Sequence, residues 1–164
     1  MIRLLLGGAR SGKSVLGEAM AASLPGPVSF LATATLDPDD TDFTRRVELH
    51  RRRRPAAWRT VEAGTALCEA VGATGGTLLI DSLGSWVAGA TDFEVDAEGL
   101  CTVLAERSGD AIVVSEEVGL GVHPSTEVGR RYRDALGVVN QAVAVAADDV
   151  MLVVAGRALR LDRW

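Results

Sequence analysis

The residues from Ile2 to Ser14 contain the motif that most constrains the fold of this chain. Positions 7–14 read GGARSGKS and fit the pattern G-x-x-x-x-G-K-[ST]. An apolar run precedes the motif, and the sequence VLGEAMAASL, which is typical of a helix, follows it. A glycine-rich loop between a strand and a helix is suited to phosphate, because its backbone N–H groups and the helix dipole face an anion. The sequence therefore predicts a phosphate-binding loop.

The residue types within this loop predict separate roles. We expect Lys13 to reach the β- and γ-phosphates of a nucleotide and the Ser14 hydroxyl to bind Mg²⁺. Lys13 is the only lysine in the chain, and arginine supplies every other cationic side chain. A compact, flexible ammonium is therefore kept where a phosphate-binding loop needs one. The expected nucleotide contacts are Gly7, Gly8, Ala9, Arg10, Ser11, Gly12, Lys13 and Ser14.

Strand and helix patterns alternate along the rest of the chain. Apolar runs predict strands at 28–34, 58–62, 77–81, 111–115 and 150–155, and helical patterns lie at 43–54, 64–71, 82–90, in a stretch ending near 107, and at 126–147. A turn at Gly156-Arg157 followed by ALRL at 158–161 predicts an antiparallel edge hairpin. We expect one α/β domain over 1–164, with a P-loop NTPase-like, mostly parallel, doubly wound sheet and helices on both faces.

Composition limits the classes of partner. The net charge of −5 and the pI of about 5.0 argue against nucleic acid as a partner. No apolar run approaches the roughly 20 residues that a membrane-spanning helix needs, so we expect a cytoplasmic protein. Cys68 and Cys101 have no metal-ligand spacing and are expected to be reduced, buried thiols.

Acidic residues end two of the predicted strands, where ligands lie in open α/β sheets. Asp81 is expected to hold Mg²⁺ together with Ser14; the alternative is that it caps the helix after it. Glu116 and Glu117 end the strand at 111–115. One of them is a candidate base for a substrate hydroxyl or a second metal contact, with Glu117 as the candidate site residue. The alternative is a carboxylate that caps the following VGLG turn.

His50 stands among seven arginines between Arg45 and Arg59. Surrounding positive charge disfavours the imidazolium, so a ring nitrogen lone pair is available for attack on phosphorus. The alternative is a solvated basic face in which the histidine has no special role. His123 is expected to be structural, and Trp58 and Trp86 to be core aromatics or the floor of a ligand pocket.

Taken together, these stretches resemble one family closely. The matching pieces are GGARSGKS (7–14), LATAT (31–35), RV-x-x-H (46–50), RRPAAWRTVE (53–62), LLIDSLGSWV (78–87), EVGLG-x-x-P (117–124) and RYRDALGVVNQAVAVAADDVMLVVAG (131–156). They resemble, in order and over nearly the whole chain, the bifunctional adenosylcobinamide kinase/adenosylcobinamide-phosphate guanylyltransferases of cobalamin biosynthesis.

The resemblance implies an activity that spacing alone does not give. Family members phosphorylate adenosylcobinamide with ATP or GTP, and then transfer GMP from GTP to its phosphate through a guanylylated histidine, whose position matches His50. The resemblance also implies a recombinase-type nucleotide-binding fold, a homotrimer, and GTP contacts at the phosphate-binding loop and at Thr33, Ala34, Thr35, Arg51, Arg52, Arg53, Arg54, Glu62 and Asp81.

Two other functions compete with this one. The first is a P-loop kinase of another small metabolite that works without a covalent intermediate. The second is a GTP-dependent switch, because residues 81–84 read D-x-x-G. A switch also needs an N-K-x-D element that reads guanine, and the only lysine of the chain already lies in the phosphate-binding loop.

Overall fold

The computed structural model describes residues 1–34 and 52–163. Seven strands form one sheet in the order β3-β2-β4-β5-β1-β6-β7. All neighbouring strands are parallel except β6 and β7, which pair antiparallel. The strands are β1 (Ile2–Gly7), β2 (Val28–Ala32), β3 (Arg59–Glu62), β4 (Thr77–Asp81), β5 (Ala111–Glu116), β6 (Asp149–Val154) and β7 (Arg157–Arg160).

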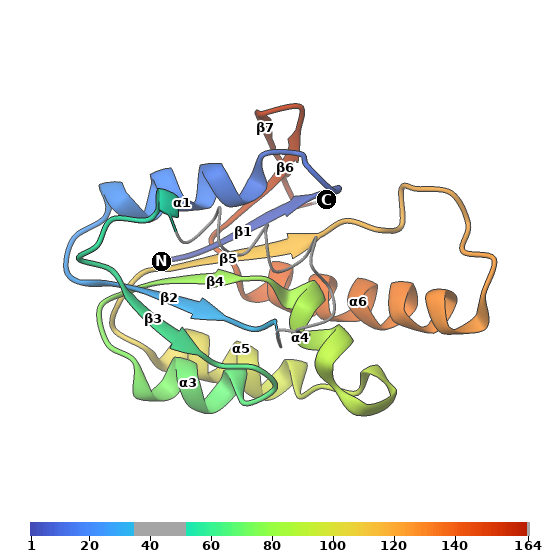
Figure 1. Cartoon of the computed structure of the whole chain (residues 1–164), viewed down its shortest axis with the longest axis horizontal. Helices are drawn as coiled ribbons and strands as arrows, with labels where there is room; N and C mark the ends of the chain where they lie inside the picture. Colours follow the sequence, from blue (N-terminus) through green and yellow to red (C-terminus); the bar gives the residue numbers. More distant parts are fainter. Residues whose placement is uncertain (35–51, 164) are drawn as a thin grey trace.

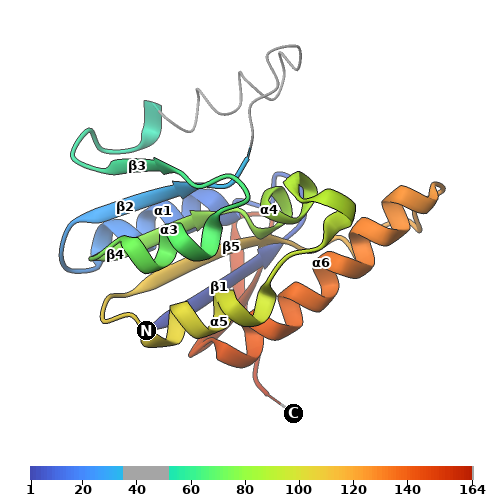
Figure 2. The same ribbon diagram turned by 90° about the horizontal axis from the view of Figure 1, so that it is seen from below.

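Helices cover both faces of the sheet (Figure 1). One face is covered by α1 (Lys13–Ser23), and the other by α3 (Leu67–Ala73), α5 (Ala97–Glu106) and α6 (Glu127–Ala146). A short helix α4 (Leu83–Gly89) and the 3₁₀ turn η1 (Thr91–Phe93) follow β4. Figure 2 shows that the N-terminal end of α6 extends past the carboxyl ends of the strands. The expected doubly wound sheet with helices on both faces is confirmed.

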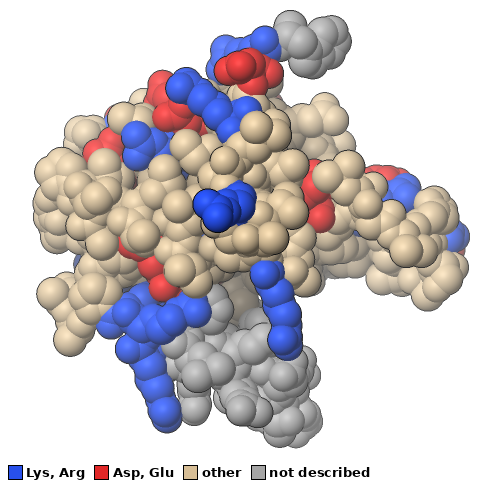
Figure 3. All heavy atoms as spheres, turned by 90° about the horizontal axis from the view of Figure 1, so that it is seen from above, with Lys and Arg blue, Asp and Glu red and all other residues tan. Residues whose placement is uncertain are grey.

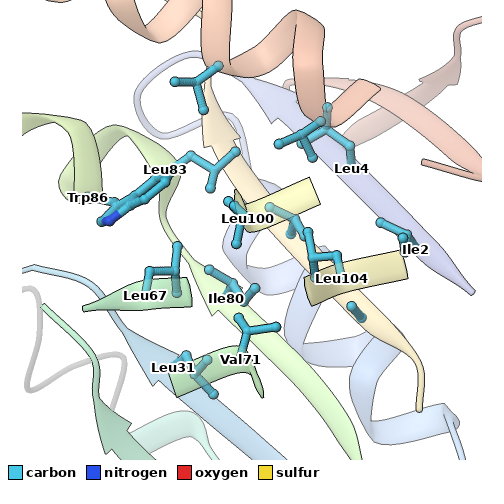
Figure 4. Close-up of a cluster of buried hydrophobic side chains, with 14 of the residues drawn as sticks. Ile2, Leu4, Leu31, Leu67, Val71, Ile80, Leu83, Trp86, Leu100 and Leu104 are labelled. Atoms are coloured by element: carbon cyan, nitrogen blue, oxygen red, sulfur yellow. The ribbon is translucent and has the colours of Figure 1, made fainter. Parts of the chain in front are cut away.

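Buried strand residues alternate between the two faces, as the two-residue period of a strand requires. Leu4 and Leu6 point into the larger cluster, under α3, α5 and α6, whereas Leu5 points to the smaller cluster under α1. Figure 4 shows the larger cluster, in which Leu31, Leu67, Val71, Ile80, Leu83, Trp86, Leu100 and Leu104 meet. Helices pack on both faces of β1, β4 and β5, which explains their continuous apolar runs.

The C-terminal hairpin is confirmed, but its turn lies one residue earlier than the sequence predicts. Residues Ala155 and Gly156 form the two-residue turn, with φ of 50° and 72°, rather than Gly156 and Arg157. Helix α3 likewise begins at Leu67 rather than at residue 64. Gly64 has a φ of 51°, a left-handed conformation in which a right-handed helix does not begin. Most of the predicted helix at 43–54 lies outside the described residues.

Within the described residues, no helix is both long enough and apolar enough to cross a membrane. Cys68 and Cys101 are free thiols that are partly rather than fully buried. Burial is the main cause that raises the pKa of each thiol, and the nearby carboxylates of Asp96 and Glu98 add to it.

Candidate active site

The pairing register of the sheet brings the ends of its strands into line. Gly7, the first residue of the phosphate-binding loop, pairs with Glu116 at the end of β5. Ala32 at the end of β2 pairs with Glu62 on one side and with Asp81 on the other. The parallel strands therefore deliver the loop and three carboxylates to one edge of the sheet, as expected for a ligand site of an open α/β fold.

The phosphate-binding loop is closed by backbone hydrogen bonds. Ser11 N donates to Gly8 O over 3.3 Å, and Leu16 N donates to Gly12 O over 3.0 Å where α1 begins. Gly12 has a φ of 96°, and Arg10 also has a positive φ, of 57°. These left-handed residues turn the chain sharply from β1 into α1. The loop is therefore a compact turn between β1 and α1, as the glycine-rich motif predicts.

Lys13 is buried although it carries a charge, and its ammonium is satisfied by two groups of the loop region. Its Nζ donates to the carbonyl of Gly8 over 3.4 Å and pairs with Glu116 Oε1 over 3.4 Å. A buried ammonium needs such partners, because its desolvation is costly. Lys13 thus joins the phosphate-binding loop to the end of β5.

The two adjacent glutamates at the end of β5 have different partners. The second oxygen of Glu116, Oε2, accepts a hydrogen bond of 2.9 Å from Ser82 Oγ. Glu117 Oε1 instead accepts a hydrogen bond of 2.6 Å from Gly119 N in the loop that follows. That contact is the turn-capping arrangement that the sequence offered as an alternative. Glu116 is thus the glutamate that the fold joins to Lys13, and a role for Glu117 in the site stays a prediction.

The end of β4 is joined to the end of β2 through one hydroxyl. Thr33 is buried; its Oγ1 donates to Ser82 O over 2.6 Å and accepts from Ser82 N over 2.9 Å. Ser82, rather than Asp81, is the N-cap of α4, because its Oγ accepts from Ser85 N. Asp81 is therefore not the helix cap, and its partly buried carboxylate remains at the strand end.

The donor set at this edge fits a Mg²⁺ ion that is shared with a nucleotide. Ser14 lies in the first turn of α1, and Asp81 ends β4. Mg²⁺ in nucleotide sites takes one or two protein oxygens and completes its shell with water and phosphate. Among residues 1–34 and 52–163, no three acidic, histidine or cysteine side chains gather to hold a metal ion on their own. A hydroxyl and a carboxylate are the oxygen ligands that such a shared ion needs.

The described part of the arginine run packs beside the loop helix and β2. Arg53 Nη2 lies 3.3 Å from Glu18 Oε1 on α1, and the Arg54 guanidinium lies 3.7 Å from the centre of the Phe30 ring. In Figure 3, Lys and Arg side chains lie at several separate places on the face seen from above, and some of them lie along its lower edge. The remaining predicted contacts are exposed Arg52 and Glu62 and partly buried Ala34, whereas Thr35, His50 and Arg51 lie outside the described residues.

The two tryptophans and the second histidine that the sequence singled out contact residues outside the phosphate-binding loop. Trp86 is buried, and its Nε1 donates to Thr65 O over 3.0 Å. Trp86 also lines a cavity of about 200 Å³ with Cys68 and Glu94. Its place in the core is confirmed, and a role as the floor of a ligand pocket stays a prediction. Trp58 packs only partly buried against the smaller core cluster. His123 is exposed, and its Nδ1 lies 2.9 Å from Arg133 Nη1; a structural role for His123 stays a prediction.

Comparison with known proteins decides the family. The family described as "Cobinamide kinase / cobinamide phosphate guanyltransferase" has a sequence model that matches residues 3–161. This chain belongs to that family. The bifunctional adenosylcobalamin biosynthesis protein CobP of Pseudomonas aeruginosa is 41% identical over 162 residues, which cover 93% of this chain and 92% of the relative. CobU of Salmonella typhimurium is 33% identical, over 98% of this chain and 99% of its own.

Solved structures add support for the fold alone. A prototypical ATPase from the type III secretion system of pathogenic bacteria superposes with a TM-score of 0.52 at 12% identity. The match covers 92% of this chain and 50% of that protein, so the chain spans about half the length of this neighbour. The likeness confirms the P-loop NTPase-like architecture that the sequence predicts.

Sequence reasoning missed two residues that position Glu116 in this cobinamide kinase/guanyltransferase family member, namely Asn140 and Gly84. Asn140 of α6 accepts from Ser115 Oγ over 2.6 Å and donates to the carbonyl of Glu116 over 3.0 Å. Gly84 leaves the space that the Glu116 carboxylate fills. The sequence contained one indication of this role, because Asn140 lies among the apolar residues of the helix, and a buried amide needs polar partners.

Proposed function

We propose that this chain phosphorylates adenosylcobinamide with a nucleoside triphosphate and then transfers GMP from GTP to the new phosphate. The product is adenosylcobinamide-GDP, an intermediate of cobalamin biosynthesis. The observation that carries this proposal is the family match over residues 3–161 together with a complete phosphate-binding loop whose Lys13 is buried beside Glu116. A loop alone would support nucleotide binding, but the full-length match supports this pair of reactions.

In the transfer reaction, we propose that His50 is the nucleophile. Its ring nitrogen attacks the α-phosphorus of GTP, the bond from that phosphorus to the bridging oxygen breaks, and pyrophosphate leaves. The phosphate of adenosylcobinamide phosphate then attacks the histidine-bound GMP and releases the imidazole. Support comes from the arginine-rich sequence around His50 and from the position of Arg53 beside α1, where cations can neutralise the leaving group.

The phosphate-binding loop supports both reactions in this proposal. Lys13 exchanges Glu116 and Gly8 for phosphate oxygens, and the backbone N–H groups of the loop hold the triphosphate. The proposed guanosine contacts are Thr33, Ala34, Thr35, Arg51, Arg52, Arg53, Arg54, Glu62 and Asp81. Mg²⁺, held by Ser14 and Asp81, would neutralise charge that develops on the leaving phosphate.

Three finer features also belong to the proposal, namely Mg²⁺ as cofactor, a homotrimer and a cytoplasmic location. Exposed apolar residues on the loop after β5 and on α6 support assembly, because Leu120, Val122 and Val138 are 79%, 96% and 66% exposed. Light scattering of the purified protein would measure its mass in solution. A mass three times that of the 17.2 kDa chain is expected, and a monomer would contradict the trimer.

The decisive experiment is intact-protein mass after incubation with Mg²⁺ and GTP. We expect the wild type to gain one GMP that mild acid removes, as a phosphoramidate requires, and we expect His50→Ala to gain none. Incubation with ATP is the control for nucleotide identity. If no adduct forms although GTP binds, the guanylyltransferase proposal fails. The chain would then act as a P-loop kinase without a covalent intermediate.

A further inference from the structure

The carboxylate of Glu116 occupies the position from which a group could act on the terminal phosphate. Its Oε1 lies 3.4 Å from Lys13 Nζ, and Lys13 is the residue that contacts the β- and γ-phosphates in loops of this kind. An oxygen at this distance from that ammonium would lie close to the γ-phosphate of a nucleotide held in the loop. A hydroxyl that attacks this phosphate must approach the same place.

Residues of α1 and α6 and the N-cap of α4 hold Glu116 in place, through contacts to its carboxylate and to its backbone carbonyl. Glu116 ends β5, and its Oε2 accepts from Ser82 Oγ, which begins α4. The carbonyl of Glu116 accepts from Asn140 Nδ2 on α6, which holds the backbone of the strand end. A Cβ at position 84 would meet both Glu116 Oε2 and Tyr132 Oη. The carboxylate of Glu116 is therefore fixed in position by Lys13 and Ser82, and it is only partly buried, so a substrate group can reach it.

We propose that Glu116 is the general base of the kinase step, an inference that rests on the function proposed above. The hydroxyl oxygen of adenosylcobinamide attacks the γ-phosphorus while its proton passes to a carboxylate oxygen of Glu116. The bond between the γ-phosphorus and the β,γ-bridging oxygen breaks, and the nucleoside diphosphate leaves with that electron pair. Glu116 then returns the proton to solvent.

This assignment separates the two reactions of the enzyme. The formation of the histidine adduct takes place at the α-phosphorus and uses a ring nitrogen lone pair, so it has no hydroxyl proton to remove. Lys13 serves both reactions, because both need the triphosphate in the loop. A base role for Glu116 therefore predicts a loss in the kinase step only, whereas a role limited to holding Lys13 predicts losses in both.

The test measures both reactions on the same preparation of Glu116→Gln. We expect the kinase kcat, measured as transfer of labelled γ-phosphate to adenosylcobinamide, to fall about 100-fold or more. The KM for nucleotide should change less than about threefold, and the yield of the GMP adduct should match the wild type. Glu106→Gln is the matched control, because Glu106 is exposed at the end of α5 that leads to the start of β5.

Each other outcome overturns the inference. A kinase kcat within a few-fold of the wild type shows that no base is lost, and parallel losses of kinase and adduct show that Glu116 acts only through Lys13. Should Glu116→Gln fail to fold, Glu116→Asp retracts the carboxylate by one methylene and should again lower the kinase kcat without lowering the adduct yield. A wild type that forms neither product contradicts the proposed function itself, which is a separate result.

Discussion

The backbone N–H of Gly156 donates a hydrogen bond of 2.8 Å to the carbonyl of Ser11. The turn of the C-terminal hairpin is thereby joined to the phosphate-binding loop, although 145 residues separate the two partners in sequence. A Cβ at Gly12 would lie 3.2 Å from Gly156 Cα, so the two backbones pack closely at this point. The hairpin of β6 and β7 thus contacts the phosphate-binding loop on one side of β1, whereas Glu116 of β5 lies on the other side.

Gly12→Ala should weaken both the fold and nucleotide binding. Gly12 has a φ of 96°, where a side chain costs about 1–2 kcal/mol, and the new methyl group would press on Gly156. We expect the free energy of unfolding to fall by about 2 kcal/mol and the affinity for GTP to fall at least tenfold. Denaturant unfolding and calorimetric titration with Mg²⁺-GTP measure the two effects.

The control for this substitution is Gly137→Ala in the middle of α6. A Cβ there meets no atom within 4 Å, and its backbone is helical, so alanine should stabilise the protein by about 0.5–1 kcal/mol. GTP affinity should stay unchanged. If the two variants had the same free energy of unfolding and the same GTP affinity, the positive φ of Gly12 and its packing against Gly156 would contribute to neither.

Ala155→Asn should stabilise the C-terminal hairpin. Ala155 and Gly156 both have positive φ, as a two-residue type I′ turn requires, and asparagine tolerates that conformation far better than alanine does. We expect a gain of about 0.5–1 kcal/mol, or roughly 1–4 °C in Tm for a chain of this size. Thermal unfolding followed by circular dichroism measures the change. A lower Tm would show that the turn needs a different geometry.

Local patterns were enough to predict the parts of the site that are continuous in sequence. The spacing of Gly7, Gly12 and Lys13 fixed the loop, and apolar runs ending in acids placed Asp81 and Glu116 at strand ends. These features follow from backbone conformation and strand periodicity, which neighbouring residues determine. The hairpin was predictable for the same reason, although its turn is shifted by one residue.

Sequence reasoning named Glu117 as the candidate site residue and left the roles of Glu116 and Glu117 open, because the choice between them depends on tertiary packing. Gly7 pairs with Glu116 across the sheet, which turns this carboxylate toward Lys13 and sends Glu117 into the next loop. Gly7 and Glu116 are far apart in the sequence, so local patterns around either residue do not predict that the two pair. The hydrogen bonds between Thr33 and Ser82 likewise join residues that are 49 positions apart in sequence. The Thr33 hydroxyl, which the sequence predicts to contact GTP, therefore also joins the end of β2 to the end of β4.

Gly84→Ala should disturb the kinase reaction by displacing Glu116. The new Cβ would meet Glu116 Oε2 and would lie 2.8 Å from Tyr132 Oη, and both of these are ends of side chains that can move. We expect the kinase kcat to fall at least tenfold and the GMP adduct to form as in the wild type. Gly89→Ala is the control, since its Cβ would meet only Thr65 Cγ2 at an ordinary 3.6 Å. Equal kinase rates in the two variants would contradict this reading.

Ionisation of Tyr132 should lower the free energy of unfolding at alkaline pH. Burial, followed by the negative charge of Glu116, raises the pKa of Tyr132 to about 12 from an ordinary value of 10. The neutral phenol, which donates to Gly84 O over 3.3 Å, is therefore favoured in the folded state. Its contribution to stability is fully present below pH 10 and is lost as the pH rises through 12, because the unfolded chain ionises first.

Tyr132→Phe isolates this effect from other groups that titrate in the same range. At pH 8 the wild type should be more stable by about 1 kcal/mol, because the variant loses the hydrogen bond to Gly84. This difference should shrink steadily between pH 10 and pH 12. Urea unfolding of both proteins at several pH values measures it, and a difference that stays constant would show that the phenol ionises equally in the folded and unfolded chains.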